Sequence, residues 1–184
     1  LEEMVETSDE WIRDRTGIEQ RRIADPSHST SDLGAAALKA ACEDADIPLE
    51  ALDVIIVATS TPDTLFPSTA CWVQQRLGLV GCAAFDVSAG CTGWLYAVEL
   101  ASALLANGNL GRSGTGMKIG VVAAEVMSKV VDWTDRSTCV LFGDGAAAAI
   151  LAPSQEQRGL LASNWGADGT LAPILYMPAG GTRK

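Results

Sequence analysis

The stretch that decides the fold is Phe85-Asp86-Val87-Ser88-Ala89-Gly90-Cys91-Thr92-Gly93-Trp94. It predicts a strand, a tight turn of small residues and a helix with Cys91 in its first turn. A helix N-terminus carries unpaired N–H groups and partial positive charge, which favours a thiolate there. Glycine on either side leaves room for a substrate carbonyl. The pattern is typical of a nucleophile held between strand and helix, so Cys91 is the candidate nucleophile.

The other four cysteines lie in apolar or helical runs and are predicted to be structural. They are Cys42, Cys71, Cys82 and Cys139. Five cysteines without a CxxC pair indicate neither a zinc site nor a disulfide framework, so we expect no metal. A reducing, cytoplasmic setting fits this usage best.

Composition limits the classes of function. The chain has 184 residues, of which 48% are hydrophobic and 20% charged, which suits one globular domain with a sizeable core. The net charge of −10 argues against a nucleic-acid partner. No apolar run is long enough to cross a bilayer, so no membrane partner is expected. The absence of an initial Met and the loop-like end at 179–184 predict truncation at both ends.

Helical and strand patterns alternate along the chain. We predict helices over 8–16, 30–44, 67–77 and 92–106, the last apolar on nearly every side and therefore buried. We predict strands over 54–58, 83–87, 119–124, 137–142 and 146–151, with a last strand over 160–164, and a flexible loop over 107–116. This order predicts an α/β fold, a mainly parallel sheet with helices on both faces.

A series of short motifs carries a family resemblance. In order they are Thr7–Ile12 with Arg15–Ile18, Thr30–Leu33, Phe66–Ser68, Ala84–Val87 with Cys91 and Gly93, Thr134–Arg136, Phe142–Gly145 and Pro178–Gly181. Together they resemble the amino-terminal half of a β-ketoacyl-acyl-carrier-protein synthase of type III, in the thiolase-like superfamily. The resemblance implies a layered α/β fold with a mainly parallel or mixed sheet and buried helices. Residues 1–184 would be the first of two duplicated halves, with the carboxy-terminal half absent from this sequence.

The resemblance also implies a reaction. Cys91 would take a short acyl group from acyl-CoA as a thioester and then pass it to malonyl-acyl carrier protein by decarboxylative Claisen condensation, initiating fatty acid biosynthesis. The implied partners are acyl-CoA, acyl carrier protein and a second copy in a homodimer, with no cofactor beyond the substrates. Phe66 and Trp94 together favour a short primer.

Further roles carry over by matching position. Trp11 would stack on the CoA adenine, Arg15 and Arg136 would flank its pantetheine and phosphates, and Thr7 would be a nearby polar contact. Phe66 would cross the dimer interface to close the partner's acyl pocket, and Phe142 would line that pocket. From pattern alone, a tryptophan such as Trp11 on a short helix is more often a core residue than a stacking platform, and an arginine pair near a helix usually belongs to a solvated face. Gly143-Asp144-Gly145 is interpreted as a strand turn only.

One departure concerns the rest of the machinery. The family pairs its cysteine with a histidine and an asparagine from the carboxy-terminal half, whereas the single histidine here, His28, lies in a polar loop and is interpreted as a bystander. The alternative within the same fold is a starter-unit ketosynthase or acyltransferase of polyketide or other secondary metabolism. A non-catalytic partner subunit and a plain structural module are the other classes, and thiol reactivity separates them.

Overall fold

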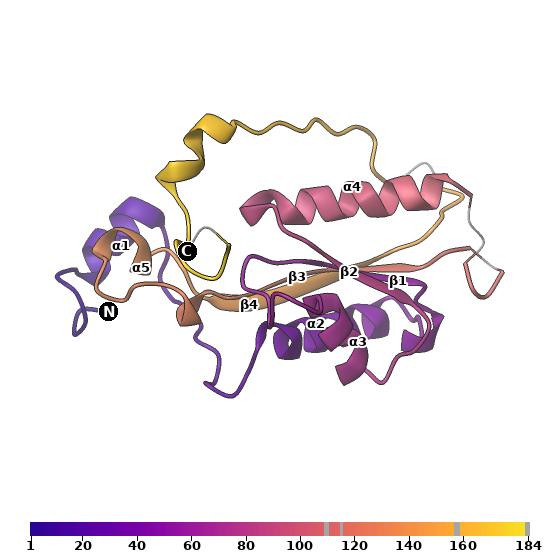
Figure 1. Cartoon of the computed structure of the whole chain (residues 1–184), viewed down its shortest axis with the longest axis horizontal. Coiled ribbons are helices and arrows are strands. Elements are labelled where there is room, and N and C mark those ends of the chain that lie inside the picture. The colour runs from indigo at the N-terminus through magenta and orange to yellow at the C-terminus, as the bar shows by residue number, and fades with distance from the viewer. Residues whose placement is uncertain (109–110, 115, 157–158, 183–184) are drawn as a thin grey trace.

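The structure is a computed structural model that describes residues 1–108, 111–114, 116–156 and 159–182. A four-stranded mixed sheet forms its centre (Figure 1). Its strands are β1 (Val54–Ala58), β2 (Ala83–Val87), β3 (Ile119–Val126) and β4 (Asp144–Leu151), in the order β2-β1-β3-β4. β1 runs parallel to β2 and β3, while β4 is antiparallel to β3. The α/β fold with a mixed sheet is therefore confirmed.

Helices cover both faces of this sheet. Helices α2 (Thr30–Asp44) and α3 (Thr69–Arg76) lie on one face, and α4 (Gly93–Ala106) lies on the other (Figure 1). Helices α1 (Asp9–Thr16) and α5 (Arg136–Cys139) form a small separate unit beyond the end of the sheet at which α4 begins. None of the described helices is long and apolar enough to span a membrane.

β1 is buried along its whole length, as its continuous apolar run predicts. Ile55 and Val57 belong to the cluster on the α2 and α3 face, with Leu38 as the largest contribution from α2. The alternate residue Ile56 belongs to the cluster on the α4 face, with Ala97. This alternation follows from the two-residue period of a strand, and it makes β1 the axis of both cores.

Local signals fix the ends of the first two helices. The Ser8 hydroxyl accepts from the N–H of Trp11 at 3.1 Å, and Gly17 ends α1 with a φ of +70°. Ser29 and Asp32 form a capping box at the start of α2. The cap at Ser8 and the left-handed Gly17 thus delimit α1 almost as the predicted helix over 8–16 has it.

Two strand predictions are wrong. Residues 137–142 begin as helix α5, because the Asp135 carboxylate accepts from the N–H of Ser137 at 2.9 Å and caps a helical turn. Residues 160–164 pair with no described strand and are exposed. Within the predicted 107–116 loop, residues 109, 110 and 115 lie outside the described residues.

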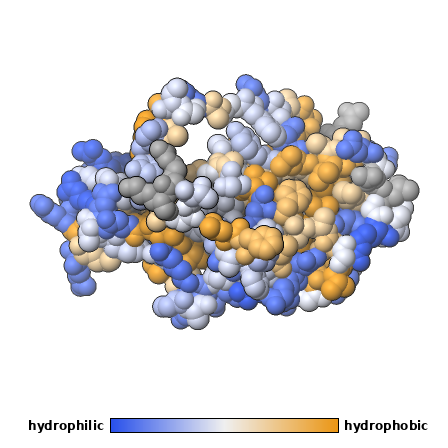
Figure 2. All heavy atoms as spheres, in the orientation of Figure 1, coloured by the Kyte–Doolittle hydropathy of each residue, from blue (hydrophilic) through white to orange (hydrophobic). Residues whose placement is uncertain are grey.

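α4 buries only the side that faces the sheet. Gly93, Ala97 and Ala101 are buried, whereas Leu95 is 63% exposed and Leu100 is also exposed. Figure 2 shows an apolar area over the part of the molecule where α4 lies. The expectation of a helix buried on nearly every side is therefore wrong. A second apolar side with Leu95 and Leu100 is exposed, and next to it the Tyr96 ring of α4 stacks on Trp165.

Asp53 ties the α4–β3 connection to the start of β1. Its buried carboxylate accepts from the N–H of Arg112 at 2.5 Å and from the N–H of Lys118 at 2.8 Å. We expect Asp53→Ala to lower the free energy of unfolding by about 2–4 kcal/mol, because two amide groups lose their acceptor. Asp53→Asn retains one acceptor oxygen and should lose about half as much. The midpoint of urea unfolding of the intact protein measures both, and an unchanged midpoint in Asp53→Ala would contradict this role.

Candidate active site at the carboxyl edge of the sheet

The carboxyl ends of the three parallel strands lie at one edge of the sheet, where ligands bind in open α/β folds. Residues 59–68 follow β1 and contain Phe66, residues 88–92 follow β2 and contain Cys91, and residues 127–135 follow β3 and lead to Arg136. β4 is antiparallel, so it begins at this same edge, two residues after Phe142. Four of the expected site residues therefore stand in connections at a single edge.

Cys91 lies in a short 3-10 turn, Gly90–Thr92, that leads directly into α4. The turn requires Gly90, whose φ is +55°. A Cβ added at Gly93 would lie 3.3 Å from the Cβ of Ala58 and 3.7 Å from the carbonyl oxygen of Val87, so glycine lets α4 start against β1. The thiol of Cys91 is exposed at this turn.

Burial separates Cys91 from the other thiols. Cys42, Cys82 and Cys139 are buried and Cys71 is half-buried. Burial raises the pKa of the Cys42 thiol, with a further contribution from nearby Glu43 and Glu50. Among the five thiols, Cys91 has the access that a nucleophile needs.

Trp11, Arg15 and Arg136 form one cluster. The Arg136 guanidinium carbon lies 4.6 Å from the centre of the Trp11 ring, and that of Arg15 lies 5.5 Å from it. Arg136 also donates to the carbonyl oxygen of Glu6 at 2.8 Å. The hydroxyl oxygen of Thr7 is buried and has no hydrogen-bond partner among the described residues. The structure therefore brings together side chains that are more than a hundred positions apart.

The two phenylalanines at this edge differ in exposure. Phe66 is 89% exposed and stands beside Leu65, which is 82% exposed, whereas Phe142 is half-buried. An apolar pair this exposed is unusual in a monomer and is typical of a contact with another chain. No described cluster of His, Cys, Asp and Glu side chains could hold a metal ion.

Asp144 is a residue whose role the sequence analysis missed. Its carboxylate accepts from the N–H of Ala24 at 2.8 Å, and from the N–H and hydroxyl of Ser128 at 2.8 and 2.6 Å. It therefore joins the extended segment 18–24 after α1, called here the 18–24 arm, to the loop after β3. The signal in the sequence is an acid between two glycines at the start of an apolar strand.

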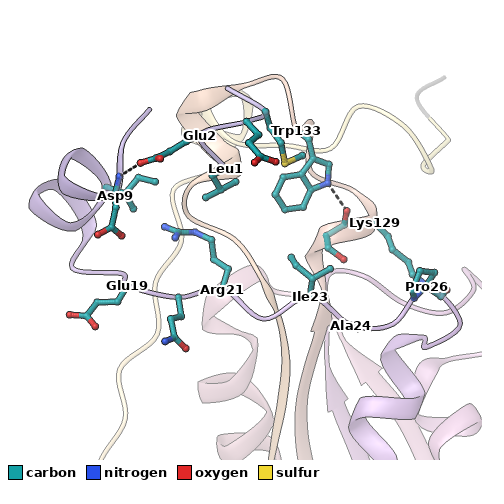
Figure 3. Close-up of a pocket in the computed structure, with 15 residues that line it drawn as sticks. Leu1, Glu2, Asp9, Glu19, Arg21, Ile23, Ala24, Pro26, Lys129 and Trp133 are labelled. Atoms are coloured by element: carbon teal, nitrogen blue, oxygen red, sulfur yellow. Dashed lines mark hydrogen bonds between the residues drawn. The ribbon is translucent and has the colours of Figure 1, made fainter. Parts of the chain in front are cut away.

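A cavity of about 880 Å³ lies beside this edge, between α1, the 18–24 arm and the loop after β3 (Figure 3). Trp133 forms part of its wall and donates from its indole N–H to the carbonyl oxygen of Ser128 at 3.0 Å. None of the seven expected site residues lines it. The lining of the cavity therefore includes neither Cys91 nor the Trp11 cluster, although Ile12 and Trp133 in its wall pack in the same apolar cluster as Trp11.

Known proteins resemble the chain along its whole length. Residues 85–169 match the family described as 3-oxoacyl-[acyl-carrier-protein] synthase III. The β-ketoacyl-[acyl-carrier-protein] synthase III of Caldanaerobacter subterraneus subsp. tengcongensis is 54% identical over 183 residues, covering 100% of this chain and 54% of that protein. The chain is similar to these synthase III proteins over its whole length. It spans about half the length of the curated synthase III relatives it matches.

Solved structures agree with this similarity. The synthase III of Thermus thermophilus is 45% identical, with a TM-score of 0.89 over 100% of this chain and 55% of that one. A priming β-ketosynthase from the R1128 polyketide biosynthetic pathway is 35% identical, with a TM-score of 0.75 over 84% of this chain and 44% of that one. The thiolase-like synthase III fold expected from the sequence is thereby confirmed.

Proposed function

We propose that this chain is the cysteine-bearing, amino-terminal half of a β-ketoacyl-acyl-carrier-protein synthase III, an acyltransferase that initiates fatty acid biosynthesis. The observation that carries the proposal is the exposed Cys91 thiol, held between β2 and α4 at the sheet edge that also presents Phe66 and Arg136. The free state of all five cysteines supports a reducing, cytoplasmic location.

The proposed reaction has two halves. The Cys91 thiolate attacks the carbonyl of a short acyl-CoA, and the CoA thiolate leaves, so that a thioester forms on sulfur. Malonyl-acyl carrier protein then loses carbon dioxide, and the carbanion attacks this thioester. A β-ketoacyl-acyl carrier protein forms and the Cys91 thiolate is released. The backbone N–H of Cys91 supplies one donor to the oxyanion of each tetrahedral intermediate.

The Trp11 cluster is the proposed CoA site. An indole face accepts a stacked base, and Arg15 and Arg136, both close to the ring, supply positive charge for phosphates. The buried Thr7 hydroxyl supports the proposal, because an unpaired polar atom there gains from a ligand hydrogen bond. We assign Phe142 to the lining of the acyl pocket.

The remaining half of the protein would complete the site. His28 lies in an exposed loop where its carbonyl oxygen accepts from Lys129 at 2.6 Å, which gives it no place beside Cys91. We therefore assign stabilisation of the decarboxylation enolate to a histidine and an asparagine outside this chain. The apolar outer side of α4, with Leu95 and Leu100 exposed, supports packing against that half.

We also propose a homodimer. β2 is the outermost strand on one side of the sheet among the described strands, and Phe85 on it is exposed. Phe66, in the loop after the neighbouring strand β1, is exposed as well. Pairing of β2 across a two-fold axis would cover this edge and place Phe66 against the partner's acyl pocket. Sedimentation of the intact protein at micromolar concentration tests this, and a clean monomer would contradict it.

Acylation tests the proposed function directly. The intact protein is incubated with acetyl-CoA, and the mass of the Cys91 peptide is measured before and after malonyl-acyl carrier protein is added. We expect an acetyl adduct on Cys91 that disappears as β-ketoacyl-acyl carrier protein forms. An unmodified Cys91 with every short acyl-CoA would disprove the function.

Thiol labelling gives a separate prediction. We expect Cys91 to react first with limiting iodoacetamide, because it is exposed while three other thiols are buried and Cys71 is half-buried. Peptide mapping of the folded protein measures the order. Faster labelling of Cys42 or Cys139 would contradict it and would favour a structural role for Cys91.

A starter-unit ketosynthase of polyketide metabolism is the second candidate. The 35% identity to the R1128 priming ketosynthase favours it, but the synthase III relatives are more similar, at 54%. The two functions share Cys91 and acyl-CoA and differ in the acceptor. Parallel assays with fatty-acid and polyketide acyl carrier proteins would separate them.

A further inference from the structure

The last two residues of β2 hold both ends of the loop that carries Phe66. The carbonyl oxygen of Val87 accepts from the N–H of Thr59, at the start of the loop, at 3.2 Å. The carboxylate of Asp86 accepts from the N–H groups of Thr69 and Ala70, just after the loop, at 2.6 and 2.8 Å. The strand that leads into the Cys91 turn thus also anchors both ends of the 59–68 loop by hydrogen bonds.

Asp86 replaces a cap that α3 lacks. Ser68 occupies the N-cap position but makes no side-chain bond to the helix N–H groups. Its hydroxyl donates instead to the sulfur of Cys71 at 3.2 Å. The first amides of α3 therefore depend on a carboxylate from another element, and a charged acceptor at a helix start is among the stronger hydrogen bonds.

Other side chains fix the loop between these ends. Glu125 on β3 accepts from the N–H of Ser60 at 2.8 Å and from the hydroxyl of Thr61 at 2.6 Å. Asp63 accepts from the N–H of Ser31 at 2.8 Å. The apolar tip formed by Leu65 and Phe66 is the part that projects from this frame.

We propose that Asp86 is a positioning residue that fixes the Phe66 loop, and so sets how far Phe66 closes the partner's acyl pocket and which primer lengths the enzyme accepts. The inference rests on the proposed function. Asp86 lies five positions before Cys91 on one strand and turn, so a single segment positions both the sulfur of one protomer and the Phe66 loop that reaches the partner's pocket across the proposed β2 pairing. Without its two bonds, the end of the loop at α3 loses its charged anchor and keeps the bonds of Asp63 to Thr69 and of Trp72 to Thr64, while Val87 still holds the start.

The test compares Asp86→Ala and Asp86→Asn with Asp53→Ala in the intact protein. Asp53 is a matched control, because its carboxylate also accepts from two backbone N–H groups. It precedes β1, whereas the Phe66 loop follows the other end of β1. Acylation of Cys91 by acetyl-CoA and by lauroyl-CoA is followed by mass spectrometry, and the thermal midpoint is recorded. Loss of stability alone would lower both acylation rates together.

We expect the lauroyl-to-acetyl rate ratio to rise roughly threefold to tenfold in Asp86→Ala, and less in Asp86→Asn, because small displacements near a reacting centre have large rate effects. Asp53→Ala should lower the thermal midpoint and leave the ratio unchanged. A ratio in both Asp86 variants equal to that of Asp53→Ala would overturn the inference, and Asp86→Asn alone decides if Asp86→Ala does not fold. A wild-type protein that takes neither acyl group would overturn the proposed function, and this inference with it.

Discussion

Cys91→Ala is expected to abolish the acyl-enzyme and to lower condensation by at least about 10³-fold, since the nucleophile is removed and none of the buried thiols can replace it. The substitution should leave the fold intact. The side chain is exposed, so the free energy of unfolding should change by less than about 0.5 kcal/mol. The measurements are the mass of the intact protein after acetyl-CoA treatment and the rate of β-ketoacyl-acyl carrier protein formation.

Cys71→Ser is the matched control for this variant. Cys71 is the next most accessible thiol and also lies in the first turn of a helix, α3, but its sulfur accepts a hydrogen bond from the Ser68 hydroxyl. We expect the control to keep the acetyl adduct and most of the condensation rate. Full activity in Cys91→Ala, or loss of activity in Cys71→Ser alone, would indicate that the nucleophile lies on α3 and would refute the proposed site.

Phe66→Ala is expected to raise the rate of Cys91 acylation by lauroyl-CoA at least about tenfold relative to acetyl-CoA. In the proposed dimer this ring closes the partner's acyl pocket, and a twelve-carbon chain needs the space that the ring fills. Phe66→Thr should act in the same direction. Neighbouring short primers should be separated much less, because one methylene is worth only about 1–3 kcal/mol in such a pocket.

Leu65→Ala provides the comparison for Phe66. Leu65 is the adjacent residue and is nearly as exposed, so its loss removes a similar apolar surface from the same loop tip. We expect this variant to retain the preference for acetyl-CoA. An equal change of the lauroyl-to-acetyl rate ratio in both variants would indicate that the loop tip acts as a general contact surface. A wild-type preference for lauroyl-CoA would disprove the closure of the acyl pocket by Phe66.

Much of the fold could be predicted from short-range patterns. The run Val54–Ala58 gave its strand because continuous apolar residues suit a strand covered on both faces, and Ser8 and Gly17 marked the ends of α1 through their own backbone chemistry. The strand prediction for 137–142 was wrong because the segment has a β-forming composition, whereas the Asp135 side chain caps a helical turn at its start. Local propensity was outweighed there by one hydrogen bond.

The site was predictable in part, for a different reason. Cys91 could be found because strand, turn and helix are contiguous in the sequence. The ties made by Asp86 to α3 and by Asp144 to Ser128 join residues 16 or more positions apart, so they depend on the packed sheet and leave no local pattern. The Trp11 cluster was reached only through the family resemblance, since α1 and α5 come from opposite parts of the chain.

The cation above Trp11 makes this indole an optical reporter. Arg136 lies 4.6 Å from the ring centre, so a base that stacks there must displace or share the guanidinium and thereby alter the emission of the indole. The chain has five tryptophans, and a variant that keeps Trp11 alone would isolate its signal. Binding of CoA at the proposed Trp11 site could then be followed in real time without labels, even in proteins whose cysteine has been replaced.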